Sequence, residues 1–338
     1  MPAICYYRQM NQPEPKKILL SGIKSTGRPH IGNYFGAMKQ FVDMQHDYES
    51  RIFIPDLHSI ISVQDAAELA QNTLDVAIDY LAIGLDPNVV TIFKQSDLPE
   101  TLELAWIFNC ITTMPYLMRA HAFKDAEAKD KEVSVGLFDY PILMAADILI
   151  HNADVVPVGQ DQKQHVEITR DTAEKFNRTF CKEYEKGDES SGVFKLPQAV
   201  ILDSVATVPG IDGRKMSKSY GNHIPLFSTD EEIRKLVMSI VTDSSGELPI
   251  NVYNMHKLFR DEEYLKKLYE ENKGKYKALK DALVEDLIAF IRPLRERREE
   301  IAKDPDQVRN MLARNGELIR EKVHPLVYEV RKRSGLII

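Results

Sequence analysis

Short apolar runs alternate with helical patterns from Lys17 to about Leu202, and this alternation constrains the fold more than any other feature of the chain. Between the runs, apolar residues recur at helical spacing, for example in residues 32–48 and 65–83. Apolar strands that alternate with helices are typical of a doubly wound parallel sheet, so we expect a Rossmann-like α/β fold. Ligands of such sheets bind at the carboxyl ends of the strands. The strands are expected within residues 16–22, 50–56, 89–95 and 153–159.

The sequence changes character after Asn222. From about Thr229 onward it is highly charged and helix-like, with no clear strand. Four residues are expected to punctuate these helices, namely Pro293, Pro305, Gly316 and Pro325. The chain has 338 residues, which is enough for two domains. We therefore predict an α/β domain over residues 1–225 and an α-helical domain over residues 226–338.

The bulk composition argues against several classes of protein. The net charge is −7 and the pI is about 5.8, which argues against a protein that coats DNA, although a local basic face for RNA remains compatible. The three cysteines lie far apart and indicate neither a disulfide framework nor a metal centre. The N-terminus has no apolar signal core, and no apolar run is long enough to cross a membrane. We expect a cytoplasmic protein with no membrane and no DNA partner.

The segment SGIKSTGRPHIGNYFG, residues 21–36, contains the first candidate nucleotide site. Gly22 and Gly27 have the separation found in a P-loop, but Arg-Pro follows where that motif needs Lys and Ser or Thr. The string GxGxxG is also absent, which weakens a dinucleotide-dependent oxidoreductase. What remains is His30 at a helix start, where free backbone N–H groups favour phosphate, and Gly32, which leaves room for an adenine ring. The alternative is a strand–turn–helix junction in which the histidine only caps the helix.

The segment GRKMSKSYGN, residues 213–222, places two lysines around a short serine-bearing stretch between glycines. A loop of this kind closes on a triphosphate, where Lys215 and Lys218 neutralise the charge that grows on departing pyrophosphate. A solvated basic turn explains most strings of the form KxxK. Here, however, KMSKS follows HIGN in an α/β domain, and this combination is far more specific than either string alone.

The two strings resemble the HIGH and KMSKS signatures of class I aminoacyl-tRNA synthetases, with Asn33 at the place of the second histidine. The block FDYPILMAADILIHNADVVPVGQDQKQHVEITRD, residues 138–171, closely resembles the tryptophanyl-tRNA synthetase family of bacterial type. This resemblance implies a HUP-type class I core as the catalytic domain, with His30, Lys215 and Lys218 as its catalytic residues. The ATP contacts that it implies are Lys24, Ser25, Thr26, Gly32, Asn33, Gly159, Gln160, Asp161, Lys215, Met216, Ser217, Lys218 and Ser219.

The same block carries the chemistry expected for choosing an amino acid. The indole of tryptophan has one donor and no acceptor, so its pocket needs one buried acceptor in an otherwise apolar slot. Tyr140, Met144 and Asp147 are spaced i, i+4 and i+7 and therefore share a helical face. On that face Asp147 accepts the indole N–H, and a ligand without this donor, such as phenylalanine, leaves the carboxylate unsatisfied. The alternative is an acid on the helix surface, but the alanines and aliphatic residues around it favour burial.

Tyrosine is the competing substrate, because its hydroxyl also donates a hydrogen bond. The related tyrosyl enzymes place a glutamine four residues after the tyrosine, where this chain has Met144, so the resemblance favours tryptophan. It also implies pocket contacts from Gln162 and His58, although His58 is equally compatible with a buried core histidine. Lys24 stands where many bacterial tryptophanyl enzymes have Gln, near the polar end of the amino acid.

The reaction implied by the resemblance is the ATP-dependent activation of L-tryptophan and its transfer to tRNA(Trp). ATP arrives with Mg²⁺, and no metal ligand comes from the protein. The resemblance further implies a homodimer with a helical dimerisation segment at about residues 100–150, and anticodon binding by residues 226–338. Two other classes stay open, a nucleotidyltransferase that does not use tRNA and a non-catalytic paralogue that binds RNA or a partner. The intact His30, Lys215, Lys218 and Asp147 argue against the second.

Overall fold

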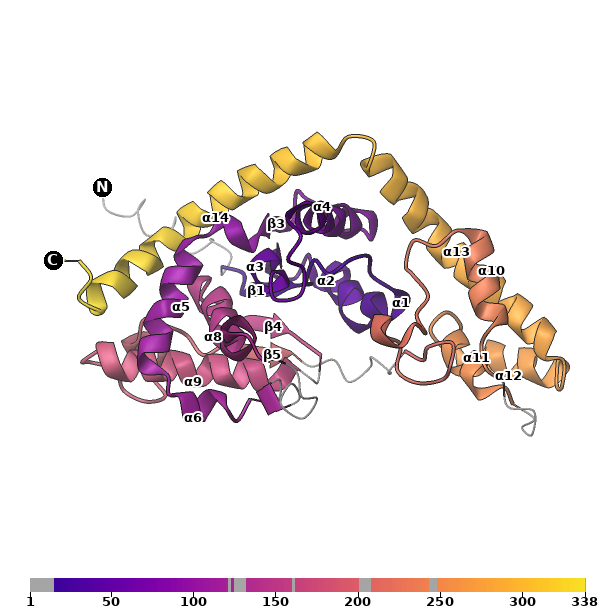
Figure 1. Cartoon of the computed structure of the whole chain (residues 1–338), viewed down its shortest axis with the longest axis horizontal. Coiled ribbons are helices and arrows are strands. Elements are labelled where there is room, and N and C mark those ends of the chain that lie inside the picture. The colour runs from indigo at the N-terminus through magenta and orange to yellow at the C-terminus, as the bar shows by residue number, and fades with distance from the viewer. Residues whose placement is uncertain are drawn as a thin grey trace, which may run out of the picture.

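A parallel β-sheet forms the centre of the protein (Figure 1). The computed structural model describes residues 15–120, 123–124, 132–159, 162–200, 208–242 and 248–337. Within these residues the sheet has five strands in the order β3-β2-β1-β4-β5, and every pairing is parallel. The strands are β1 (Ile18–Gly22), β2 (Glu49–Ile54), β3 (Thr91–Lys94), β4 (Val155–Pro157) and β5 (Gln198–Val200). The predicted doubly wound sheet is therefore confirmed.

Helices cover both faces of this sheet, because successive side chains of a strand point to opposite sides. The helices of the α/β region are α1 (Ile31–Asn33), η1 (Tyr34–Met38), α2 (Lys39–Met44), α3 (Asp56–Ser59), α4 (Ala66–Ala82), η2 (Gln95–Asp97), α5 (Glu100–Ile111), α6 (Met114–Leu117), α8 (Val135–Ile150), α9 (Lys163–Phe180), η4 (Glu189–Ser191) and η5 (Lys218–Tyr220). Leu19 and Ile92 pack in one buried apolar cluster with α2 and α4. Their neighbours Leu20 and Phe93 pack in a second cluster with α5, α8 and α9. None of the helices in the described residues is long and apolar enough to cross a membrane.

The C-terminal region is helical, as predicted, and packs back onto the α/β region. Its helices are α10 (Asp230–Met238), α11 (Ile250–His256), α12 (Glu262–Glu271), α13 (Tyr276–Ile301) and α14 (Pro305–Arg333). Helices α13 and α14 form a long bent arm along α4 and the β3 edge of the sheet (Figure 1). Asn315 of α14 donates a hydrogen bond from Nδ2 to the carbonyl oxygen of Ile92 in β3, at 2.9 Å. Because an open sheet edge invites unwanted strand pairing, α14 protects β3.

The apolar core continues across the domain boundary predicted near residue 225. Leu283, Leu287 and Ile291 of α13 belong to the same buried cluster as Leu74 and Val76 of α4. The C-terminal helices are therefore stabilised by burial against the sheet layer, and not only by contacts among themselves.

Two predictions of local structure need correction. Pro305 begins α14, as expected, but Pro293, Gly316 and Pro325 lie inside helices instead of ending them. Tertiary packing along these long helices outweighs the local cost of a helix-breaking residue. Strand β5 was not predicted, because it has three residues and lies partly exposed at the sheet edge, where a short run gives no apolar signal.

Candidate active site

His30 is the N-cap residue of α1, and its imidazole closes the first turn of that helix. Its Nδ1 accepts a hydrogen bond from the backbone N–H of Asn33 at 3.2 Å, and Oδ1 of Asn33 accepts one from the backbone N–H of His30 at 3.0 Å. Since Nδ1 is an acceptor, the neutral ring carries its proton on Nε2. Burial, together with nearby His223 and Lys218, lowers the pKa of His30 to about 4. The histidine therefore caps the helix as a neutral ring, and it also lines the cavity described below.

The KMSKS loop, residues 215–219, is fixed at its base by Asn222, a buried residue that the sequence analysis did not identify. Oδ1 of Asn222 accepts a hydrogen bond from the backbone N–H of Ser217 at 2.8 Å. Its Nδ2 donates to the carbonyl oxygen of Lys215 at 3.2 Å. Met216 is buried in the same apolar cluster as α4. One amide and one methionine thus anchor the base of the loop.

HIGN and the chain that follows KMSKS lie side by side, although they are far apart in the sequence. The backbone N–H of Ile31 donates to the carbonyl oxygen of Ile224 at 3.0 Å. Gly32 lies at the junction, where an added Cβ would come within 2.8 Å of the His30 ring and 3.4 Å of the Cβ of Met216. Glycine at this position is therefore required mainly by the His30 ring, which folds back over it, in addition to the space for adenine that the sequence suggested.

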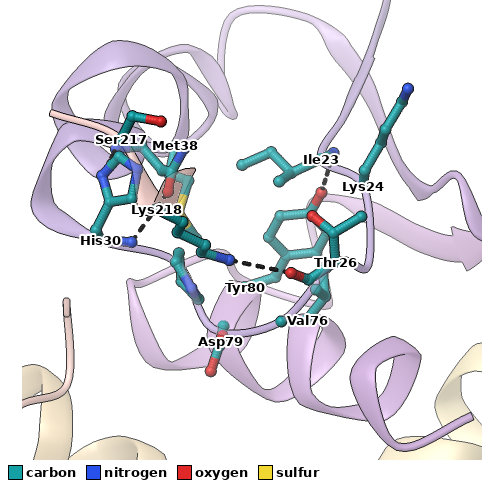
Figure 2. Close-up of a pocket in the computed structure, with 13 residues that line it drawn as sticks. Ile23, Lys24, Thr26, His30, Met38, Val76, Asp79, Tyr80, Ser217 and Lys218 are labelled. Atoms are coloured by element: carbon teal, nitrogen blue, oxygen red, sulfur yellow. Dashed lines mark hydrogen bonds between the residues drawn. The ribbon is translucent and has the colours of Figure 1, made fainter. Parts of the chain in front are cut away.

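A cavity of about 230 Å³ lies where these motifs meet α4 (Figure 2). Lys218 reaches into it and donates a hydrogen bond from Nζ to the carbonyl oxygen of Thr26, 192 residues away in the sequence, at 3.2 Å. Desolvation lowers the pKa of both Lys218 and Lys24. The residues that line the cavity are Ile23, Lys24, Thr26, Gly27, Pro29, His30, Asn33, Met38, Val76, Asp79, Tyr80, Ser217 and Lys218. Two ammonium groups and a neutral imidazole make this a site for an anion, whereas the backbone N–H groups of Ile31 and Asn33 already donate hydrogen bonds within the protein.

Asp79 of α4 is a buried acid beside these cations. Its Oδ1 accepts a hydrogen bond at 2.6 Å from Nε of Arg298, which also bonds Oδ1 of Asp75 at 2.7 Å. No hydrogen bond from a described residue reaches Oδ2 of Asp79. Burial raises the pKa of Asp79 to about 6 against the opposing effect of Arg298. The carboxylate in turn favours the charged form of Lys218.

Some residues predicted to contact ATP lie elsewhere. Ser25 is fully buried, and its hydroxyl donates to Oγ of Ser59 at 3.0 Å and accepts from Oγ1 of Thr73 at 3.3 Å. Its side chain therefore belongs to a buried hydroxyl chain under the turn. Lys215 and Ser219 are exposed on the KMSKS loop. The structure thus brings Lys218, but not the side chain of Ser25, into the cavity.

The end of β4 carries the other predicted nucleotide contacts. Gly159 is exposed just after the strand, and its carbonyl oxygen accepts a hydrogen bond from the backbone N–H of Gln162 at 2.9 Å. Gln162 caps α9 and is partly buried. Gln160 and Asp161 lie outside the described residues, so their predicted contacts with ATP stay predictions.

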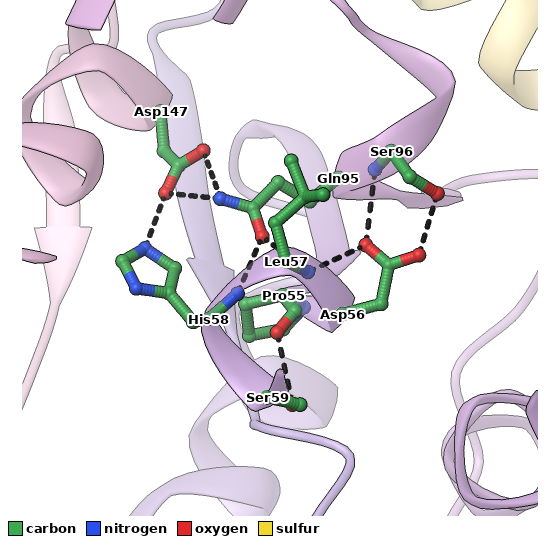
Figure 3. A network of polar contacts seen from close by, with 8 residues as sticks. All are labelled: Pro55, Asp56, Leu57, His58, Ser59, Gln95, Ser96 and Asp147. Carbon is green, nitrogen blue, oxygen red and sulfur yellow. Dashed lines mark hydrogen bonds and ion pairs between the residues drawn. The ribbon is translucent and has the colours of Figure 1, made fainter. Parts of the chain in front are cut away.

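Asp147 of α8 lies in a buried polar network at the carboxyl ends of β2 and β3 (Figure 3). Nε2 of His58 lies 2.9 Å from Oδ2 of Asp147. Nε2 of Gln95 donates to Oδ1 at 2.7 Å and lies 3.0 Å from Oδ2. Burial raises the pKa of Asp147, and the hydrogen bonds from His58 and Gln95 oppose this rise. No described residue bonds the other ring nitrogen of His58, Nδ1.

Tyr140 and Met144 precede Asp147 on α8, and both are partly buried. The hydroxyl of Tyr140 lies 2.6 Å from Nε2 of His165. Nζ of Lys24 lies 5.2 Å from the centroid of the Tyr140 ring. Because Lys24 also lines the cavity, it connects the nucleotide end of the site with the amino-acid end.

Sequence reasoning missed Gln95, Asp79 and Asn222. Gln95 directly follows β3 at the carboxyl end of the sheet, and this position was a usable signal for a site residue. Asp79 gave a weaker signal, as an acid among the apolar positions of α4. Asn222 gave none, because its importance depends on contacts that the loop makes only after folding.

The parallel sheet with HIGN and KMSKS at its carboxyl edge defines a class I aminoacyl-tRNA synthetase core. Residues 12–292 match the family model for tRNA synthetases class I (W and Y), and the chain belongs to this family. It is similar to the tryptophan–tRNA ligase of Fusobacterium nucleatum, with 45% identity over 94% of this chain and 98% of the relative. The corresponding ligase of Rhodopirellula baltica is 42% identical over 94% of this chain and 99% of its own length.

A solved structure agrees with these relatives. The crystal structure of Campylobacter jejuni tryptophanyl-tRNA synthetase complexed with ADP and tryptophan superposes with a TM-score of 0.83 at 38% identity. The superposition covers 94% of this chain and 99% of the other. The resemblance to bacterial tryptophanyl-tRNA synthetases expected from the sequence is therefore confirmed.

Proposed function

We propose that this chain activates L-tryptophan with ATP and transfers it to tRNA(Trp), using the cavity and the Asp147 network described above. The expected enzyme class, tryptophan–tRNA ligase, is confirmed by relatives of that name at 42% and 45% identity. The observation that carries the residue assignment is the hydrogen bond from Lys218 to Thr26, because it brings the KMSKS loop over the cavity lined by HIGN. The ADP in the Campylobacter jejuni enzyme supports ATP as the nucleotide.

In the first step, a carboxylate oxygen of tryptophan attacks the α-phosphorus of Mg·ATP. The new oxygen–phosphorus bond forms as the bond from the α-phosphorus to the bridging oxygen breaks, and pyrophosphate leaves with that electron pair. The attacking carboxylate is already ionised, so no general base is needed, and the rate depends on in-line positioning and on charge stabilisation. We assign this stabilisation to Lys218 and Lys24, with His30 as a neutral donor from Nε2. Lys215 joins them when the loop moves over the phosphates.

The magnesium ion enters as part of the substrate. Among the described residues, no group of three or more His, Cys, Asp or Glu side chains is arranged to hold a metal ion. Mg²⁺ in nucleotide sites keeps several waters and binds chiefly to phosphate oxygens. We therefore assign its ligands to the triphosphate.

The side chain of tryptophan is selected at the other end. We assign the indole N–H to the carboxylate of Asp147, and the ring faces to Tyr140 and Met144. Gln162 and His58 complete the pocket. The bound tryptophan of the Campylobacter jejuni enzyme supports this amino acid as the substrate class of the site.

In the second step, a hydroxyl of the terminal ribose of tRNA attacks the carbonyl carbon of tryptophanyl-adenylate. The bond from that carbon to the phosphate oxygen breaks, AMP leaves with its electron pair, and the hydroxyl proton is released. The helices of residues 226–338 are our candidates for binding the anticodon end. A homodimer is supported by the exposed apolar side chains of Trp106, Met114 and Val135, which are 70%, 66% and 82% exposed within or beside α5, α6 and α8. The sparse cysteines support a reducing cytoplasm as the location.

A pyrophosphate-exchange assay with each standard amino acid tests the function. Exchange that depends on tryptophan supports the proposal. Exchange driven by tyrosine instead would show that the enzyme activates tyrosine, the competing substrate. Absence of exchange with every amino acid would favour a non-catalytic RNA-binding protein. Sedimentation of Trp106→Glu alongside the wild type tests the dimer, since a charge on that surface should produce monomers.

A further inference from the structure

Gln95 lies between Asp147 and the start of α3, and no role assigned above includes it. It directly follows β3, and its side chain is buried, with 2% of the residue exposed. Its Nε2 lies 2.7 Å and 3.0 Å from the two carboxylate oxygens of Asp147. Its Oε1 accepts hydrogen bonds from the backbone N–H groups of Leu57 at 3.1 Å and His58 at 3.3 Å. One amide thus connects the end of β3, the first turn of α3 and the last turn of α8 (Figure 3).

The orientation of this amide is fixed by its partners. The backbone N–H groups of Leu57 and His58 only donate, so the atom of Gln95 that faces them must be the oxygen. An ionised carboxylate only accepts, so the atom that faces Asp147 must be the nitrogen. A reversed amide would oppose donors to donors and an oxygen to the carboxylate, and each mismatch buries an unsatisfied group. Glutamine has the required acceptor and donor at the same distance from the backbone.

This arrangement leaves one carboxylate oxygen of Asp147, Oδ1, able to accept a further hydrogen bond. Oδ2 faces two donors, Nε2 of His58 at 2.9 Å and Nε2 of Gln95 at 3.0 Å. Oδ1 faces one described donor, Nε2 of Gln95 at 2.7 Å. Since a carboxylate oxygen has two lone pairs, Oδ1 keeps one for a ligand.

We propose that Gln95 is a positioning residue for amino-acid selection, which keeps the Asp147 carboxylate ionised and oriented so that Oδ1 accepts the indole N–H. The inference rests on the proposed contact between Asp147 and indole. It differs from a purely structural role, because it predicts that Gln95 acts on tryptophan through the protonation and orientation of another side chain.

Two variants test this role. Gln95→Met keeps the length but removes both hydrogen-bonding ends, and we expect the KM for tryptophan to rise about 10- to 100-fold with little change in the KM for ATP. Gln95→Glu keeps an acceptor for Leu57 and His58 but places an oxygen against Asp147. Two carboxylates this close hold one proton between them, which restores a donor to Asp147. The activity of Gln95→Glu with tryptophan should therefore rise relative to the wild type as the pH falls from about 8 to about 6.

A substrate analogue separates this inference from the proposed function. In benzothienylalanine a sulfur replaces the indole N–H, and we expect the wild type to prefer tryptophan by about 100-fold or more in kcat/KM for pyrophosphate exchange. In Gln95→Met this preference should shrink at least about tenfold. A folded Gln95→Met that keeps the full preference, or a Gln95→Glu without acid rescue, overturns the role of Gln95. A wild type without preference refutes the Asp147 contact itself, and the inference falls with it.

Ser96→Ala is the matched control. Ser96 is the next residue, and its hydroxyl donates to Oδ2 of Asp56 at 2.5 Å, on the side of the network away from Asp147 (Figure 3). We expect its kcat/KM for tryptophan to stay within about twofold of the wild type. A loss equal to that of Gln95→Met would assign the effect to the turn as a whole and overturn the proposal.

Discussion

The two ends of the active site hold their polar groups in different ways. At the amino-acid end, Asp147, His58 and Gln95 are buried and bonded to one another. At the nucleotide end, Lys24 lies in the turn after β1 and Lys218 in the KMSKS loop, and both side chains carry a lowered pKa. The indole N–H is the same before and after reaction, so a fixed acceptor suits it. The charge on the phosphates changes during reaction, so cations placed beside them stabilise the transition state more than the ground state.

The largest effect should come from Asp147→Ala. This change removes the fixed acceptor and leaves His58 and Gln95 facing an empty space. We expect kcat/KM for tryptophan to fall about a thousandfold while the KM for ATP changes little, since a site built for a donor depends on that hydrogen bond. Steady-state pyrophosphate exchange measures both constants. Equal losses for tryptophan and ATP would show that the two ends are not independent.

Asp139→Asn provides the control on the same helix. The Asp139 carboxylate accepts a hydrogen bond from Nδ2 of Asn109 at 2.7 Å, outside the Asp147 network. Tryptophan kinetics close to the wild type are expected. A defect as large as that of Asp147→Ala would indicate that α8 as a whole is sensitive to lost charge.

The next effect concerns the nucleotide end. Lys218→Met should lower the rate of adenylate formation about a hundredfold with a small change in tryptophan binding, because the ammonium acts on charge that develops in the transition state. Lys215→Met should cost less, because Lys218 lines the cavity and bonds Thr26, whereas Lys215 is not among the residues that line the cavity. Rapid-quench kinetics measure the step directly. Equal losses in the two variants would mean that the loop adopts another arrangement when ATP binds.

Much of the fold and part of the site could be predicted from the sequence. The strands were recognisable because both faces of the sheet are buried, which gives continuous apolar runs, whereas the partly exposed β5 gave no such run. The HIGN and KMSKS strings identified the nucleotide end because each string is local. Gln95 and Asp147, in contrast, are 52 residues apart, and Asp79 and Arg298 are 219 residues apart. Such pairs follow from packing, which no local pattern encodes.

Lys24 lies where the nucleotide end and the amino-acid end of the site meet. Its Nζ lies 5.2 Å from the Tyr140 ring centroid, and it also lines the cavity. We expect Lys24→Met to lower the rate of adenylate formation about tenfold, since one cation is lost where the carboxylate meets the α-phosphate. The affinity for ATP, measured with and without tryptophan, should also become less dependent on the amino acid. A variant that changes only ATP affinity would place Lys24 at the nucleotide end alone.

The smallest expected effect is on stability, and it follows from a difference between the two buried aspartates, Asp79 and Asp147. Both oxygens of Asp147 have described donors, whereas Oδ2 of Asp79 has none, and burial raises the pKa of Asp79 to about 6 from an ordinary value of 3.8. The folded protein therefore binds this proton more tightly than the unfolded chain does, and the resulting stability is lost as the pH rises through about 6. Asp79→Asn exchanges no proton at this position. From about pH 5 to about pH 7.5 the free energy of unfolding of the wild type should fall by about 1 kcal/mol relative to the variant. Urea unfolding at the two pH values measures this difference, and a constant difference would show that Arg298 keeps Asp79 ionised throughout.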